Sequence, residues 1–180
     1  SAPQSTTAPD IATLGDIAAQ PSITIYRNSS RYNSFPDIKR LPDGRLLCVF
    51  RDAAYPEHIR HIEADARIVG CVSKDHGRSW SEPTVIYDGP ECQNDPSVAV
   101  LNDGRLLLTF FNWVGRSGDY VRKHKPPYAR KVSRGQWGEY AEPDGVYRLW
   151  GDAKDLTWNK EPIRLAGSNT ILRATSASTI

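Results

Sequence analysis

Short apolar runs alternate with turn-forming residues along most of the chain. The runs are rich in β-branched and aromatic residues, and Gly, Pro, Asp and Asn separate them. No long window repeats its apolar residues with the 3.6-residue period of a helix. The pattern therefore predicts an all-β protein. The expected strands cover residues 22–27, 37–41, 45–51, 66–73, 84–87, 97–101, 105–112, 145–150 and 163–165.

One segment of the chain occurs twice. Residues 36–47 read Pro-Asp-Ile-Lys-Arg-Leu-Pro-Asp-Gly-Arg-Leu-Leu, and residues 96–107, which lie 60 positions further on, read Pro-Ser-Val-Ala-Val-Leu-Asn-Asp-Gly-Arg-Leu-Leu. Asp-Gly between two apolar runs favours a hairpin with a type I′ turn, because Gly accepts a positive φ at no steric cost. Repetition at a fixed interval is typical of propellers and solenoids.

A second element recurs less closely. Residues 73–83 close the first unit and residues 152–162 occupy the corresponding place in the second, with Trp80 and Trp158 at matching positions. The two tryptophans are 78 residues apart, so the second unit contains a longer insertion, which we assign to residues 115–138. The expected organisation is a flexible leader over residues 1–20, a first unit over 21–90, a second over 91–167 and the opening strand of a third over 168–180.

The motif Ser73-x-Asp75-x-Gly77-x-x-Trp80 resembles the Asp-box, or BNR repeat, of sialidases and related propellers. Asp75 and Gly77 suit a tight hairpin, and Trp80 can pack its ring under the turn. The resemblance implies a structural role for the box and a sialidase-like, six-bladed β-propeller. On this interpretation the chain supplies about two blades and the start of a third. Closing the ring then requires the remaining blades or another chain, and we expect a fragment or a processed chain.

The resemblance extends over roughly residues 30–165 and bears on the substrate. Ser34-Phe35-Pro36 stands where sialidases carry Phe/Tyr-Arg-Ile-Pro, so Ser34 replaces the arginine that binds the carboxylate of sialic acid. A neutral hydroxyl cannot replace a bidentate guanidinium, which argues against sialic acid itself. Arg31 or Arg51 could take over a carboxylate if the loops allow it.

The segment after the second predicted strand is rich in titratable groups, and in sialidases a loop at this point carries the acid/base carboxylate. The groups in this chain are Asp52, Glu57, His58, Arg60, His61, Glu63 and Asp65. By resemblance Glu63 and Asp65 are the catalytic candidates, with Arg51, Asp52, Asp95 and Trp113 as substrate-binding candidates. Each also has a structural interpretation: a solvated loop carboxylate for Glu63 or Asp65, a turn cap for Asp95, and rim packing for Trp113.

Composition excludes several function classes. The chain has 23 basic and 21 acidic residues scattered along its length, giving a net charge of +2, so there is no electrostatic case for a nucleic-acid partner. A basic cluster at residues 122–125 and 130–131 is expected to decorate a long loop. No run approaches the roughly 20 apolar residues of a membrane span. We expect a secreted protein from which the signal peptide has already been removed.

The three cysteines are too few for a disulfide-built scaffold. Cys48 and Cys71 lie in apolar runs and are expected to be small buried hydrophobes, although a bridge between them is conceivable, with Cys92 left over. No Cys or His spacing suggests zinc, and we expect neither a metal nor another cofactor.

Two functions remain open from the sequence. The first is a secreted sialidase-like glycoside hydrolase that acts on glycan termini, and the second is a non-catalytic propeller that binds a carbohydrate or a protein.

Overall fold

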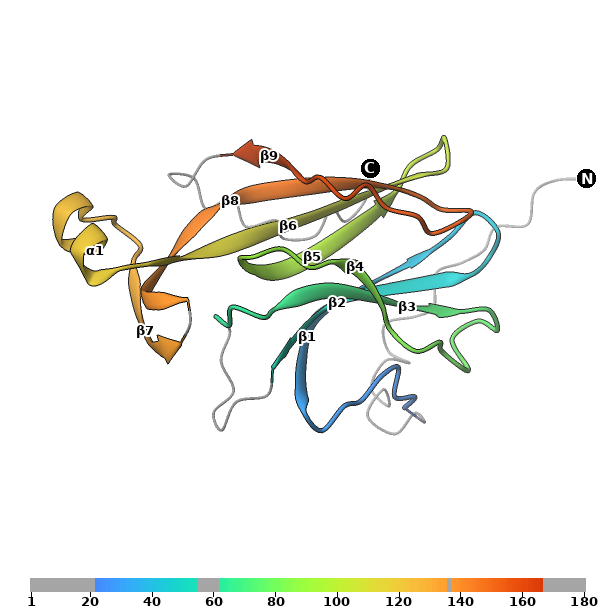
Figure 1. Ribbon diagram of the computed structural model, residues 1–180. Helices are drawn as coiled ribbons and strands as arrows, with labels where there is room; N and C mark the ends of the chain where they lie inside the picture. Colours follow the sequence, from blue (N-terminus) through green and yellow to red (C-terminus); the bar gives the residue numbers. More distant parts are fainter. Residues whose placement is uncertain (1–21, 55–61, 136, 167–180) are drawn as a thin grey trace, which may run out of the picture.

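Two antiparallel β-sheets make up the part of the chain that the computed structural model describes, residues 22–54, 62–135 and 137–166 (Figure 1). The first sheet contains β1 (Arg31–Arg40), β2 (Leu46–Ala54), β3 (Arg67–Ser73) and β4 (Thr84–Tyr87). The second contains β5 (Cys92–Val100), β6 (Arg105–Arg116), β7 (Arg130–Gly135), β8 (Gly138–Asp152) and β9 (Ile163–Ala166). The sheets are ordered β1-β2-β3-β4 and β5-β6-β8-β7, with β9 also paired to β8. The predicted all-β class is confirmed.

The Asp-Gly hairpins join the first two strands of each sheet through the same hydrogen bonds. Leu41 N donates to Arg45 O (2.8 Å) and Gly44 N to Leu41 O (3.0 Å), and the distances at Leu101 and Gly104 are 2.9 and 3.0 Å. Gly44 and Gly104 have φ of 90° and 83°, whereas the residues before them keep a negative φ. The expected type I′ turn is therefore wrong. The loop has three residues and ends on a left-handed glycine, and the ring of Pro42 excludes a positive φ in the first copy.

The first strand of each sheet begins earlier than the sequence predicts. In β1 the pairing shifts register between Ser34 and Asp37, and in β5 it shifts between Asn94 and Ser97. The residue before each proline is left-handed, with φ of 56° at Phe35 and 46° at Asp95. A proline has no N–H for the ladder, so the strand passes it in a bulge and then continues.

One predicted strand is wrong, and several predictions lie outside the described residues. Residues 22–30 form no strand; Ile25 and Tyr26 instead pack on the face of the first sheet that carries Cys48 and Phe50. Side chains from this segment thus cover a sheet face, and its backbone does not extend the sheet. Outside the described residues lie the predicted leader (1–20), the predicted third-unit strand (168–180), and Glu57, His58, Arg60 and His61.

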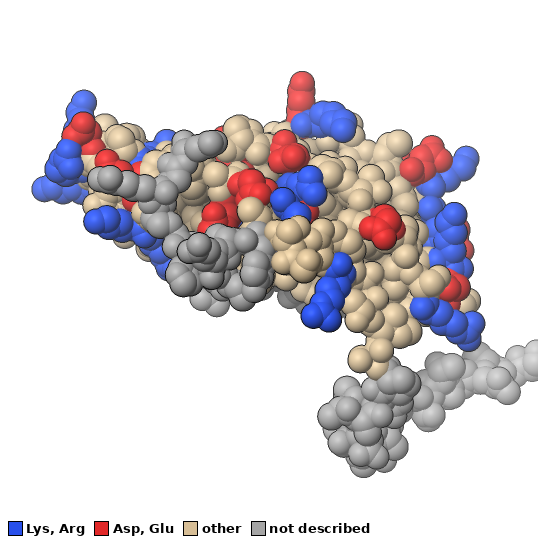
Figure 2. All heavy atoms as spheres, turned by 60° about the horizontal axis from the view of Figure 1, so that its bottom comes forward, with Lys and Arg blue, Asp and Glu red and all other residues tan. Residues whose placement is uncertain are grey.

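The insertion in the second unit forms a projecting arm. We call residues 113–143 the arm: β6 and β8 stay paired there, from Trp113 with Pro143 to Arg116 with Tyr140, and helix α1 (Gly118–His124) and β7 lie between them. Ser117 caps the helix by accepting a hydrogen bond from Tyr120 N (3.1 Å). In Figure 2, Lys and Arg side chains lie at this end of the molecule with some acidic side chains among them, and another group lies at the opposite end. Neither α1 nor β7 was predicted from the sequence.

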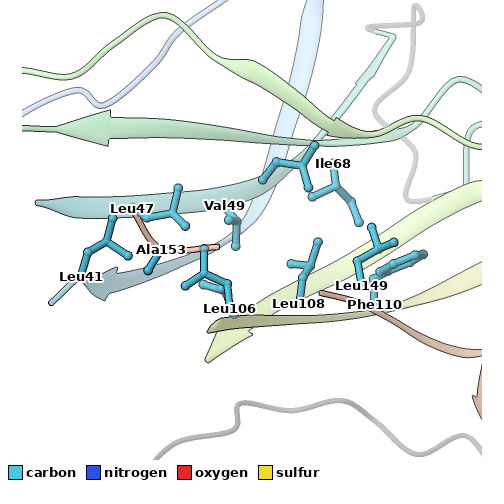
Figure 3. Close-up of a cluster of buried hydrophobic side chains, with 11 residues drawn as sticks. Leu41, Leu47, Val49, Ile68, Leu106, Leu108, Phe110, Leu149 and Ala153 are labelled. Atoms are coloured by element: carbon cyan, nitrogen blue, oxygen red, sulfur yellow. The ribbon is translucent and has the colours of Figure 1, made fainter. Parts of the chain in front are cut away.

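The main core lies between the two sheets. Alternate residues of β2 and of β6 point into it, as the two-residue period of a strand requires. Figure 3 shows side chains of β2 and β3 facing those of β6 and β8. The buried members are Leu41, Leu47, Val49, Ile68, Ile86, Val98, Leu106, Leu108, Phe110, Leu149 and Ala153. Among the described residues, no helix is long and apolar enough to cross a membrane.

All three cysteines are free thiols and buried, as was expected for Cys48 and Cys71. Cys48 and Cys71 lie opposite each other in the pairing of β2 with β3, yet no disulfide joins them. Burial raises the pKa of Cys48 to about 12 and that of Cys71 to about 11. Both thiols are therefore protonated and unreactive at neutral pH.

Candidate functional site

The predicted site residues gather at one end of the two sheets. This end is formed by the start of β1, the end of β2, the turn before β3, the start of β5 and the end of β6. Because neighbouring strands run antiparallel, strand starts and strand ends meet there. Cross-sheet contacts join the two sheets at this end: Gln93 N donates to Ala66 O (3.5 Å), and Cys92 packs with Ala53 and Ala66. We call it the site end; the Asp-Gly hairpins lie at the other, the hairpin end.

Asp52 is the centre of an ion-pair network at the site end. Its carboxylate, only 1% exposed, accepts hydrogen bonds from Arg31 Nε (2.9 Å), Arg67 Nε (2.8 Å) and Asn33 Nδ2 (2.9 Å). The three donors come from β1 and β3, on either side of β2. A buried carboxylate shared by two arginines is well satisfied, and it holds both guanidinium groups in place.

Asp65 and Arg31 are joined to the same network. Both oxygens of Asp65 accept from Ala54 N at 3.0 Å, and Arg31 Nη1 donates to Oδ2 at 3.3 Å. Arg31 Nη2 also donates to Asp52 O (3.0 Å), so all three nitrogens of this guanidinium bind protein groups. The Asp65 side chain is still 47% exposed. Asp65 is therefore an accessible carboxylate next to Arg31, an arginine whose nitrogens are all hydrogen-bonded to the protein.

Arg67 differs from Arg31 because its terminal guanidinium nitrogens are not engaged by described residues. Its side chain is 32% exposed, and only Nε donates to Asp52. Among the described residues, no hydrogen bond or ion pair engages its two terminal nitrogens. Arg67 is therefore the cation of this network that retains donors for an external anion.

Cys92 collects three donors beside the network. Asn94 Nδ2 lies 3.0 Å from its sulfur, Glu63 N 3.3 Å and Arg51 Nη2 3.9 Å. Burial raises the pKa of the Cys92 thiol, although Arg51 and the hydrogen bonds act in the opposite direction. Arg51 is fully buried, with its guanidinium 5.8 Å from the ring centre of Tyr32, and its Nε and Nη1 have no hydrogen-bond partner. This cluster connects Arg51 to the backbone of Glu63.

Trp113 and Asp95 complete the site end on the second sheet. Trp113 packs against the small cluster of Ala53, Ala66 and Cys92, and the Arg130 guanidinium lies 5.5 Å from its ring centre. Asp95 occupies the left-handed position of the β5 bulge, directly after buried Asn94. Neither residue is at a strand end as the sequence suggested: Asp95 is the fourth residue of β5, and Trp113 lies at a register shift three residues before the end of β6.

A cavity of about 190 Å³ opens on the face of the first sheet away from the core. The hydroxyl of Ser34, which replaces the expected arginine, lines it and is buried without a hydrogen-bond partner. The other lining residues are Ile25, Tyr26, Asn33, Pro36, Cys48 and Phe50. The environment of Ser34 is therefore largely apolar and contains no charged side chain among the lining residues.

The loop over residues 73–80 lies at the hairpin end. Asp75 accepts from the Ser79 hydroxyl (2.6 Å), Ser79 N (2.9 Å) and the Ser73 hydroxyl (2.9 Å). These hydrogen bonds lower the pKa of Asp75 to about 2. Gly77 has φ of 88°, and Trp80 Nε1 donates to Gly77 O at 3.1 Å. The side chains of Ser73, Asp75, Ser79 and Trp80 thus all form hydrogen bonds within the loop, which indicates a structural role.

The corresponding loop of the second sheet, residues 152–158, forms a comparable turn with different residues. Asp152 Oδ1 accepts from Lys154 N (2.8 Å) and Asp155 N (3.2 Å). Leu156 takes the left-handed conformation, with φ of 55°. Arg45, from the hairpin of the first sheet, donates to Ala153 O and Lys154 O, both at 2.8 Å, and so fastens the two sheets together.

The structure brings the predicted residues to one end of the sheets, but the partners of the charged groups there were not predicted from the sequence. Arg67, Asn33, Cys92 and Asn94 were not assigned to the site. The available signal was positional: these residues lie at strand ends that neighbour Asp52 or Trp113 once the sheet order is known. Among the described residues, no group of three or more His, Cys, Asp or Glu side chains is placed to hold a metal ion.

Comparisons with known proteins give a distant resemblance. No family model matches the chain. Over 151 residues it is 27% identical to a curated protein named Sialidase from Paraclostridium sordellii, a match that covers 79% of this chain and 34% of that protein. The chain thus spans about a third of the length of this relative.

Solved structures include one with a similar fold. A protein of unknown function from Dyadobacter fermentans superposes with a TM-score of 0.66 at 25% identity, covering 78% of this chain and 38% of that one. A PL25 ulvan lyase reaches a TM-score of 0.48 at 16% identity, covering 74% of this chain and 28% of the lyase.

Proposed function

We propose that the chain forms two consecutive blades of a sialidase-like β-propeller. In each sheet the strands succeed one another from the first strand outwards, β1 to β4 in one and β5, β6, β8 and β9 in the other. The first strands are neighbours: Asp37 accepts from Val98 N (2.9 Å) and from the Ser97 hydroxyl (3.0 Å). Sheets that meet along their first strands and pack face to face fit blades around a common axis.

The outward face of the second sheet supports further blades. On β6 the residues between the buried core positions are Leu107, Thr109 and Phe111, and on β8 Trp150 alternates in the same way with buried Leu149. Ile163 on β9 is 51% exposed. An apolar sheet face of this kind needs a partner layer, and a third blade would supply one.

We further propose that the intact protein is a secreted, glycan-active enzyme with its site at the site end. The observation that carries this proposal is that four residues chosen from sequence as site residues come from three separate segments and lie at that end: Glu63 and Asp65 before β3, Asp95 in β5 and Trp113 in β6. The 27% identity to a protein named Sialidase agrees with a glycan ligand. The loop over residues 73–80 is the proposed Asp-box and lies at the opposite end, outside the site.

The geometry suggests separate roles for the site residues. Asp65, one of the two carboxylates assigned to proton transfer, is accessible and forms an ion pair with Arg31. Asp52 and Arg51 are buried, so in this proposal they position Arg31, Arg67 and the Cys92 segment. Arg67, Asp95 and Trp113 are assigned to the ligand, with the ring of Trp113 as a stacking surface for a sugar.

The enzyme proposal is tested by turnover of a panel of aryl glycosides by the intact protein. Glu63→Gln and Asp65→Asn keep the side-chain size, and the amide oxygen that the second substitution introduces can still accept from Ala54 N. Removing an acid/base group lowers kcat/KM by about 10²- to 10⁴-fold, so at least one variant should show a loss of this size. Glu82→Gln and Asp155→Asn, at the hairpin end, are the matched controls. If no glycoside in the panel is hydrolysed by the wild-type protein, the enzyme proposal is wrong.

A specific observation favours a binding protein as the alternative. Arg31, one of the two arginines considered as a replacement for the missing one, has all its guanidinium nitrogens bound to Asp52 and Asp65. A non-catalytic propeller would bind a carbohydrate or a protein surface through the same end. In that case Glu63→Gln and Asp65→Asn leave ligand affinity within a few-fold of wild type. Neither the wild-type protein nor the variants hydrolyse a glycoside.

A further inference from the structure

The arm carries an excess of exposed positive charge that the site does not account for. Its described side chains include six Lys or Arg residues and three acidic residues. Arg116 pairs with Glu142 (2.6 Å) and Arg122 with Asp119. The Glu139 carboxylate lies beside the start of α1, where it accepts from Gly118 N at 3.4 Å. Apart from the two ion pairs, the described part of the arm therefore contains one acidic group, Glu139, and four cations.

These four cations are unpaired within the described part of the chain. Lys123 and Lys125 lie at the end of α1 and Arg130 and Lys131 at the start of β7, and all four are exposed. None of them forms an ion pair with a described residue. Because the whole chain has a net charge of only +2, the positive charge is concentrated on the arm. A concentrated field of one sign attracts a polyion of the opposite sign.

The arm also borders the proposed sugar-binding surface. Arg130 lies over Trp113, so one of the four cations contacts the aromatic ring assigned to the ligand. Tyr128, in the turn between α1 and β7, is 46% exposed and adds a second ring among the cations. Cations interleaved with exposed aromatic rings suit a polymer that carries both negative groups and sugar rings.

We infer that the arm binds the extended part of an anionic polysaccharide, one with sulfate or uronate groups, and directs its end towards Trp113. This inference rests on the proposed glycan function for the nature of the polymer. It names a substrate class that the site end alone does not define. The binding is electrostatic along the arm and becomes specific for a sugar only at the site end.

The test is binding of dextran sulfate to the intact protein, with neutral dextran of equal length as the reference. The arm variant combines Lys123→Gln, Lys125→Gln and Lys131→Gln; Arg130 is left in place because it contacts Trp113. The matched control combines Lys74→Gln, Lys154→Gln and Lys160→Gln, three exposed lysines outside the arm. Wild type and control should bind dextran sulfate much more tightly than dextran, and the arm variant should bind it about tenfold more weakly than both. Circular dichroism checks that each variant is folded.

Two results would overturn the inference. One is an equal loss of affinity in the arm variant and the control, which would make the binding a property of net charge. The other is equal or tighter binding of poly-glutamate at the same charge, which would indicate an acidic protein as partner. The proposed function fails separately: an absence of glycoside turnover together with arm-dependent binding of dextran sulfate would reject the enzyme and leave the arm's role intact.

Discussion

The two ends of the sheets differ in what the two copies of the repeat share. At the hairpin end the copies have the same loop length, the same hydrogen bonds and a left-handed glycine at the same position, Gly44 or Gly104. At the site end they share only the course of the backbone, with a bulge and a left-handed residue before proline. The side chains there differ: Asp52 binds two arginines in the first sheet, and the Cys92 sulfur collects donors at the second.

This difference separates what the fold requires from what the site requires. A three-residue hairpin needs a positive φ at one position, so both copies contain the same residue there. A bulge at a strand end requires no particular side chain on its neighbours, so charge and size can vary without a change in the sheet. The chemistry of the chain is therefore expected where the copies differ.

The largest effect on stability should come from Asp52. Asp52→Ala removes the shared carboxylate of Arg31 and Arg67 and the acceptor of Asn33. We expect a loss of about 3 kcal/mol in the free energy of unfolding, because three partly buried donors lose a shared charged partner. Urea denaturation of the intact protein measures it.

The matched control is Asp103→Ala at the hairpin end. Asp103 binds Arg105, with both side chains more than half exposed, so solvent screens the pair and the loss should be far smaller. Equal losses in the two variants would show that the site end is no more organised than the hairpin end.

A smaller loss in the free energy of unfolding is expected at the two hairpin glycines, and the loss should be the same at both. A Cβ at Gly44 or Gly104 meets no atom within 4 Å, so the cost of alanine comes from the positive φ alone. Each of Gly44→Ala and Gly104→Ala should lower the free energy of unfolding by about 1 kcal/mol. Asparagine tolerates this conformation better, so Gly44→Asn should restore part of the loss. Clearly unequal losses in the two alanine variants would mean that the hairpins are not equivalent.

The smallest effect concerns the acid stability of the loop over residues 73–80. Hydrogen bonds from Ser79 and Ser73 lower the pKa of Asp75 from 3.8 to about 2. A lowered folded-state pKa contributes stability that is present above about pH 4 and is lost as the pH falls towards 2. Asp75→Asn should therefore flatten the pH dependence of stability in this range. Ser79→Ala should weaken the same pH dependence without abolishing it. An unchanged slope in Asp75→Asn, measured by thermal unfolding between about pH 5 and pH 2, would contradict this assignment.

Sequence reasoning succeeded where the structure depends on local backbone demands. Asp-Gly between apolar runs located both hairpins, because few other residues allow the turn. It located the insertion at residues 115–138 but not the helix within it, since residues 118–124 lack an apolar face and show no helical period. It also began the first strand of each sheet only after Pro36 and Pro96, because a proline inside a strand requires a bulge that the sequence does not reveal.

The site was predictable as a set of residues near the ends of strands, but its contacts were not. The position of Asp65 after β2 identified it as a loop carboxylate, yet the capping of Ala54 N depends on how the turn before β3 folds back. The pairing of Asp52 with Arg67 requires the order of three strands. Long-range contacts of this kind are fixed by the sheet and not by neighbours in sequence.

The arrangement of successive sheets around one centre is tested most directly by a crystal structure of the intact protein. The account predicts a further antiparallel sheet packed on the face with Leu107, Phe111 and Trp150, its first strand beside β5 as β5 lies beside β1. A helical layer on that face, or a continuous sheet extending β9, would contradict it.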